Sequence, residues 1–136
     1  MIRTLFALVA VLAFTGIAAA QDEPDCKNPE TQSDMTACAQ LDHEAADKEL
    51  NAVWKKARAA AEKVDDDQWE DSLRGAEKAL LAGQRGWIAY RDGQCELYGF
   101  EARGGTMEPM LVAGCKAQMT RARTKELRDF IAGPGQ

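Results

Sequence analysis

The fold is decided by the stretch Leu80-Leu81-Ala82-Gly83-Gln84-Arg85-Gly86-Trp87-Ile88-Ala89-Tyr90-Arg91-Asp92-Gly93-Gln94-Cys95. Apolar side chains in and before it recur every three or four residues, as on one face of an amphipathic helix: Leu73, Ala76, Leu80, Trp87 and Ile88. Gln84 and Arg91 fall on the same face, so an amide and a guanidinium lie among apolar side chains. Buried polar groups need hydrogen-bonding partners, which we expect facing helices to supply. Trp87 is predicted to be a core residue.

The same periodicity predicts one helix before this stretch and one after it. The first covers about 34–64, with Thr31 or Ser33 as N-cap and Asp34 in the first turn. The third covers about 106–131. Its predicted buried face is Leu111, Cys115, Met119, Ala122, Leu127, Phe130 and Ile131. Because no stretch alternates with period two for long, we predict an all-α, antiparallel three-helix bundle.

The run Asp65-Asp66-Asp67 is interpreted as a turn that caps the second helix, expected over 67–92. If this turn folds the first two helices together, polar residues of both helices fall at similar heights. That geometry places Asn51 near Leu80, Asp47 near Gln84 and Gln40 near Arg91. We therefore predict a structural polar layer, with a functional role of Arg91 or Asp47 as the alternative. Its members are Asp47, Asn51, Gln84 and Arg91.

The N-terminus has the features of a secretory signal peptide. Met1-Ile2-Arg3 is basic, an uncharged apolar run follows, and Ala18-Ala19-Ala20 supplies the small residues before a cleavage site. A membrane anchor is the alternative, but the run is short for a bilayer. The sequence predicts a periplasmic or secreted protein, with no membrane insertion after cleavage. The domain organisation is a signal peptide (1–20), a flexible acidic lead (21–33), a helical domain (34–131) and a disordered tail (132–136).

The charge balance is acidic. The chain has 17 Lys and Arg against 22 Asp and Glu, a net charge of −5. Cleavage would remove one positive charge, Arg3, and leave −6. Such a domain is unsuited to nucleic acid and to anionic membranes, and it favours a basic partner or none.

The four cysteines all follow the predicted cleavage site, and an even number in an oxidising compartment indicates two disulfides. We predict Cys26–Cys38, a local clasp at the start of the first helix, and Cys95–Cys115, which joins the second helix to the third. Four cysteines allow three connectivities, so the other two pairings stay open. A zinc site is the competing interpretation, and the absence of a C-x-x-C motif disfavours it.

No catalytic arrangement is visible in the sequence. His43 is the one histidine, and between Asp42 and Glu44 it is expected on a solvated helix face. Without a second histidine or a free thiol there is neither a triad nor a two-histidine metal centre. We therefore expect a protein that is not an enzyme, with no catalytic residues, metal or cofactor.

Glycines are frequent between Gly93 and Gly105, which predicts a glycine-rich loop between the second and third helices. Tyr98, Phe100 and Arg103 lie within it. We interpret these three residues as a candidate partner-binding loop.

Two motifs together carry a family resemblance. The pattern Asp47-x-x-Leu50-Asn51-x-x-Trp54, followed by Leu80-x-x-x-Gln84-x-x-Trp87-x-x-Tyr90-Arg91-Asp92-x-x-Cys95, resembles the LprI-like lysozyme-inhibitor N-terminal domain family. The likeness extends from Cys26 to Leu127. It is supported by Met35-x-x-Cys38, Gly104-Gly105-Thr106, Cys115, Arg121 or Arg123, and Leu127.

This resemblance implies a small, exported, disulfide-bonded helical domain that inhibits a host or competitor lysozyme. The chain lacks the cysteine of the lipoprotein members at the cleavage site, which favours a soluble periplasmic form. The expected partner is a basic lysozyme, with Arg103 as a candidate to pair with carboxylates of the enzyme's cleft. The alternative function is a periplasmic interaction or envelope-stress module without lysozyme activity. The oligomeric state is left open.

Overall fold

The computed structural model describes residues 24–133, and over them the chain forms three α-helices, two short 3₁₀ helices and no strand. The elements are α1 (Gln32–Asp66), η1 (Asp71–Leu73), α2 (Ala76–Gly99), η2 (Phe100–Ala102) and α3 (Glu108–Ala132). The predicted all-α fold with three helices is confirmed. The expected signal peptide (1–20) lies outside the described residues, as do the ends of the lead and the tail. No helix in the described part of the chain is long and apolar enough to cross a membrane.

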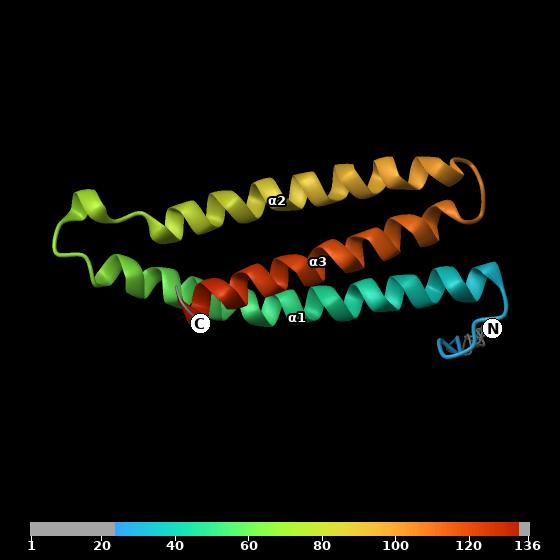
Figure 1. Cartoon of the computed structure of the whole chain (residues 1–136), viewed down its shortest axis with the longest axis horizontal. Helices are drawn as coiled ribbons and strands as arrows, with labels where there is room; N and C mark the ends of the chain where they lie inside the picture. Colours follow the sequence, from blue (N-terminus) through green and yellow to red (C-terminus); the bar gives the residue numbers. More distant parts are fainter. Residues whose placement is uncertain (1–23, 134–136) are drawn as a thin grey trace, which may run out of the picture.

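The three helices form an elongated rod (Figure 1). α1 runs along its whole length, and a 35-residue helix is about 50 Å long. α2 returns in the opposite direction, and α3 runs back beside α1. The rod therefore has two ends with chain connections, one between α1 and α2 and one between α2 and α3.

Small side chains let α1 and α3 lie close together. Both helices have buried residues at steps of three or four, much as in a coiled coil. They are Ala46, Leu50, Val53, Ala57 and Ala61 of α1, and Ala113, Ala117, Thr120, Thr124 and Leu127 of α3. Small side chains each bury little apolar area and so contribute little hydrophobic free energy. The larger apolar residues of the core gather around Leu50, Val53 and Leu127.

Trp87 lies partly buried against this core, together with Trp54 and Leu80, which supports its predicted core role. The rest of the predicted face is only partly correct. Leu73 and Ile88 are 53% and 41% exposed, because Leu73 precedes α2 and Ile88 faces outward.

The predicted buried face of the third helix is wrong in part. Ala122, Phe130 and Ile131 are exposed, whereas the neighbouring small residues Thr120 and Thr124 are buried. Ala122 lies off the face of α3 that carries Thr120, Thr124 and Leu127, and Phe130 and Ile131 belong to the last turn of the helix.

The N-terminus of α1 is capped as the sequence predicts. The Thr31 hydroxyl accepts from the Asp34 N–H at 3.1 Å, and the Asp34 carboxylate accepts from the Thr31 N–H at 3.1 Å. This reciprocal pair is a capping box, which satisfies two backbone donors that the helix itself cannot.

The connection between α1 and α2 differs from the prediction. α1 continues to Asp66, and α2 begins at Ala76 rather than at residue 67. Asp65 does cap α2, but from ten residues away. Its carboxylate accepts backbone N–H groups of Gly75 at 2.7 Å, Ala76 at 2.7 Å and Glu77 at 3.1 Å.

Both predicted disulfides are present. Cys26–Cys38 has its Cα atoms 5.5 Å apart and fastens the lead segment to α1. Cys95–Cys115 has its Cα atoms 5.4 Å apart and joins α2 to α3. Cys95 is fully buried. No cysteine within residues 24–133 is left free for a metal or for nucleophilic chemistry.

The connection between α2 and α3 is shorter than the predicted glycine-rich loop. α2 continues through Gly93 to Gly99, so Tyr98 lies on its last helical turn. Gly99 is buried against Val112 of α3, where a Cβ atom would lie 2.6 Å from the valine methyl group. A glycine is required at this position by close packing rather than by loop conformation.

Candidate functional site

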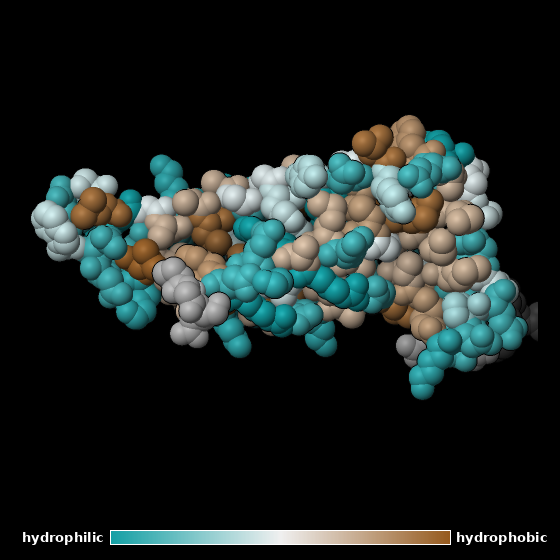
Figure 2. Space-filling model, viewed as in Figure 1, coloured by the Kyte–Doolittle hydropathy of each residue, from teal (hydrophilic) through white to brown (hydrophobic). Residues whose placement is uncertain are grey.

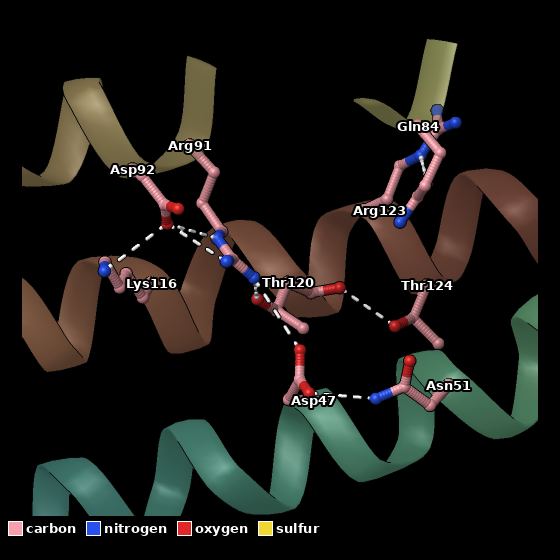
Figure 3. Close-up of polar contacts among 9 residues, drawn as sticks. All are labelled: Asp47, Asn51, Gln84, Arg91, Asp92, Lys116, Thr120, Arg123 and Thr124. Atoms are coloured by element: carbon pink, nitrogen blue, oxygen red, sulfur yellow. Dashed lines mark hydrogen bonds and ion pairs between the residues drawn. The ribbon is translucent and has the colours of Figure 1, made fainter. Parts of the chain in front are cut away.

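Arg91 of α2 is the centre of a polar layer between the three helices (Figure 3). Only 11% of its side chain is exposed. Its guanidinium lies 3.7 Å from the Asp47 carboxylate of α1 and donates to the Thr120 hydroxyl of α3 at 3.3 Å. It also donates to the adjacent Asp92 at 3.0 Å and lies over the Trp87 ring, 5.0 Å from its centroid. One side chain thus links all three helices.

Two further residues complete this layer (Figure 3). Asn51, one turn after Asp47, donates to the Asp47 carboxylate at 2.9 Å. Lys116 of α3 lies 3.3 Å from the Asp92 carboxylate. Burial alone would raise the pKa of Asp92, but its hydrogen bond to Arg91 and the charges of Arg91 and Lys116 outweigh burial and lower it. The layer is a charge-balanced network, as a partly buried polar cluster requires.

Gln84 belongs to a separate contact. It is 9% exposed and accepts a hydrogen bond from Arg123 of α3 at 3.0 Å. Arg123 in turn lies 2.8 Å from Glu126. Figure 3 shows this pair apart from the Arg91 cluster.

The predicted register between the first two helices is therefore wrong. Arg91 faces Asp47 instead of Gln40, and Gln84 faces α3 instead of Asp47. The shift along α1 is about two helical turns. It arises because residues 67–75 form a connection with its own 3₁₀ turn, where the prediction had a direct turn.

His43 also differs from its predicted position on a solvated face. It is half-buried, and its Nε2 atom is buried without a hydrogen-bonding partner. Burial lowers its pKa, and the nearby positive charges of Arg91 and Lys116 lower it further, against the opposing effect of Asp47 and Asp92. A shallow groove runs along α1 past this imidazole, lined by His43, Glu44, Asp47, Lys48, Asn51, Ala52 and Lys55. Burial and these two cations therefore favour the neutral form of the imidazole.

The candidate partner-binding residues are divided between two roles. Tyr98 is 43% exposed and lines an apolar hollow with Met110, Leu111 and other residues beside the Cys95–Cys115 disulfide. Figure 2 shows a largely hydrophobic surface toward this end of the rod. Phe100, two residues after Tyr98 in the sequence, is exposed as well.

Arg103, in contrast, is already engaged within the chain. Its guanidinium lies 2.6 Å from the Glu108 carboxylate and 4.3 Å from the Phe100 ring centroid. Glu108 also accepts the Gly104 N–H at 2.8 Å, and this backbone hydrogen bond is the main reason that the pKa of Glu108 is lowered. Gly104 has a φ of +76°, which favours glycine. Arg103 therefore stabilises the connection between α2 and α3, and its charge is already paired within the chain.

The opposite end of the rod carries a residue that the sequence analysis missed. Trp69, between α1 and η1, is 84% exposed. The signal for it was a tryptophan outside any helical periodicity, within a run of acidic residues. Across the described residues, no group of His, Cys, Asp and Glu side chains has the arrangement of a metal site.

These features define a small, disulfide-bonded helical domain stabilised by a polar layer, with exposed apolar residues at both ends. A family model described as lysozyme inhibitor LprI matches residues 25–127, so the chain belongs to the LprI family. It is 49% identical over 128 residues to the uncharacterized protein R02472 of Rhizobium meliloti (strain 1021), covering 92% of each chain. No solved structure matches.

Proposed function

We propose that this chain is an exported inhibitor that binds a basic lysozyme and blocks it. The observation that carries the proposal is the family match over residues 25–127, which includes α1, α2, most of α3 and both disulfides. Two disulfides suit an oxidising compartment outside the cytoplasm. Export would use the expected signal peptide at residues 1–20 and leave the helical domain in the periplasm.

The charge of the chain supports a basic partner. A net charge of −5 gives an attractive long-range field toward a cationic enzyme and raises the rate of encounter. Many of the basic side chains are already paired within the chain. Arg121 pairs with Asp42 and Arg128 with Glu49, which forms a charge-balanced band on α1 and α3.

The contact surface predicted from the sequence is the α2–α3 end. Exposed Tyr98 and Phe100 and the apolar hollow support it. Arg103 supports it less, because pairing with a lysozyme carboxylate would require it to leave Glu108. An inhibitor of this kind needs a rigid apolar anchor as well as charge.

The experiment is a lysis assay with purified mature protein and several lysozyme types, combined with binding kinetics at low and physiological salt. We expect inhibition of at least one basic lysozyme. The association rate constant should fall as salt rises, because screening beyond about 8–10 Å removes the steering field. The control is a neutral lysozyme, whose association rate constant should depend less on salt. If no lysozyme binds even at low salt, the proposed function is wrong, and the alternative function, a periplasmic interaction or envelope-stress module, takes its place.

A further inference from the structure

Trp69 is the most exposed of the large hydrophobic residues that the structure describes, at 84%. Leu73 of η1 is 53% exposed, and Val64 on the last turn of α1 is 43% exposed. We call residues 64–75 the α1–α2 tip. Tryptophan is enriched among the few residues that provide most of the binding energy of an interface. An indole held in water at the end of a rod is a candidate for that role.

The tip is ordered by polar contacts, with almost no burial. The Asp65 carboxylate accepts three backbone N–H groups at the start of α2. Gln68 donates to the Val64 carbonyl at 3.1 Å, and Arg74 donates to the Gln68 carbonyl at 3.5 Å. These contacts fix the backbone on both sides of Trp69 while leaving its side chain outside. A preorganised anchor loses less conformational entropy when it binds.

The charges around Trp69 are negative. Residues 64–75 contain five carboxylates and one basic residue, Arg74. Lys63, just before them, lies 2.7 Å from the Asp67 carboxylate, and the net charge of the tip is still negative. Asp65 is used as the cap, and Asp71 is 94% exposed although it contacts Arg74. Figure 2 shows this end of the molecule as hydrophilic atoms around isolated hydrophobic ones. An apolar anchor surrounded by carboxylates suits a cationic protein surface, and it is repelled by anionic lipid and by nucleic acid.

The two ends of the rod differ in what they offer such a partner. At the α2–α3 end, Arg103 and Glu108 neutralise each other, and Tyr98 is half as exposed as Trp69. At the α1–α2 tip, anchor and charge occur together. We propose that the α1–α2 tip is the surface that binds a cationic lysozyme, with Trp69 as its apolar anchor. This inference rests on the proposed function and specifies its contact surface.

The first experiment compares Trp69→Ala with Tyr98→Ala at the other end and with a matched control, Tyr90→Ala, at an α2 residue that is 61% exposed. Binding is measured to hen egg-white lysozyme or whichever basic lysozyme the wild-type protein inhibits. Trp69→Ala should raise Kd about 30-fold or more, mainly through faster dissociation. Its melting temperature should stay within about 2 °C of the wild type, because the indole packs on little. Tyr90→Ala should bind as the wild type does, and Tyr98→Ala should weaken binding less than Trp69→Ala.

The outcomes separate this inference from the function itself. If Trp69→Ala binds normally while Tyr98→Ala binds weakly, the function stands and the α2–α3 end is the contact surface. If both variants bind normally, the function stands and neither end provides the anchor, which overturns the inference. If the wild-type protein binds no lysozyme, the proposed function fails and the inference fails with it.

A second experiment reports on the indole directly. The chain has three tryptophans, so protein labelled with 5-fluorotryptophan gives three ¹⁹F resonances, assigned with Trp69→Phe. Addition of unlabelled lysozyme should shift or broaden the Trp69 resonance most, because Trp54 and Trp87 lie against the core. An unchanged Trp69 resonance in a sample where the complex has formed would contradict the proposal.

Discussion

Arg91 and Asp47 face each other across the α1–α2 interface, with Nη1 of the arginine 3.7 Å from Oδ1 of the aspartate. Only 11% of the arginine side chain is exposed, against 44% of the aspartate. The same guanidinium also reaches α3 through the Thr120 hydroxyl. The contact therefore fixes the height of α2 relative to both other helices.

Replacing Arg91 with alanine should lower the free energy of unfolding by about 2 kcal/mol. The variant loses a charged hydrogen bond to Thr120 and the contact with Trp87, while Asp47 stays accessible to water. Arg91→Lys should lose less stability than Arg91→Ala, since its ammonium keeps the positive charge but lacks the planar set of donors of a guanidinium. Urea unfolding measures the change. Lys125→Ala, which breaks an exposed pair with Asp129, is the control and should cost less than about 0.5 kcal/mol. An Arg91→Ala variant as stable as this control would show that the layer is dispensable.

The stability of the protein should depend on pH through its one histidine. The pKa of His43 is lowered from its ordinary value of 6.5, chiefly by burial and then by Arg91. The unfolded chain therefore binds a proton more readily than the folded one. The stabilisation is complete above pH 6.5 and is lost as pH falls through the lowered pKa.

Thermal unfolding at pH 7.5 and 5.5 should show a larger drop for the wild-type protein than for His43→Gln. The glutamine keeps a polar side chain of similar size but does not titrate. An NMR titration of the single imidazole gives the folded-state pKa independently. A value at or above 6.5 would remove the physical basis of this prediction.

Much of the fold could be predicted from local patterns. Helical periodicity predicted the three helices, and the hydroxyl residues Thr31 and Ser33 predicted an N-cap of α1, which Thr31 provides. The cysteine positions relative to the helices predicted both disulfides. Each of these depends on residues near one another in the chain, where geometry follows from spacing alone.

Features set by distant residues could not be predicted in the same way. The register of Arg91 depends on the length of the α1–α2 connection. This length could not be predicted from the position of Asp65, because Asp65 caps α2 from ten residues away. The buried face of α3 depends on where α1 packs against it, so Thr120 is buried, while Phe130 on the last turn of α3 is 41% exposed. Trp69 belongs to no periodic pattern, and tertiary structure alone shows that its side chain lies in water.

The two disulfides should contribute unequally to stability. In the chain-entropy model, each loop of this size is worth about 3 kcal/mol. Cys95–Cys115 joins two packed helices, so replacing both cysteines with alanine should cost close to that amount. Cys26–Cys38 fastens a lead segment outside the helices, and its removal frees that segment in the folded state as well. Its alanine variant should cost less than half as much in urea unfolding. Equal losses would show that the lead contributes to the cooperative core.

Alanine substitutions at two glycines of α2, Gly93 and Gly99, test the close contact between α2 and α3. At Gly93 an added Cβ meets nothing within 4 Å, so Gly93→Ala should stabilise the protein by about 0.5–1 kcal/mol through better helix propensity. At Gly99 an added Cβ would lie 2.6 Å from Val112 and 3.4 Å from Glu108. Gly99→Ala should therefore destabilise by about 1–3 kcal/mol, because α2 and α3 must separate. Adding Val112→Ala to Gly99→Ala removes the clash and should recover part of the loss. Equal effects of the two glycine substitutions would contradict the tight packing at this end, since backbone entropy alone changes similarly at both positions.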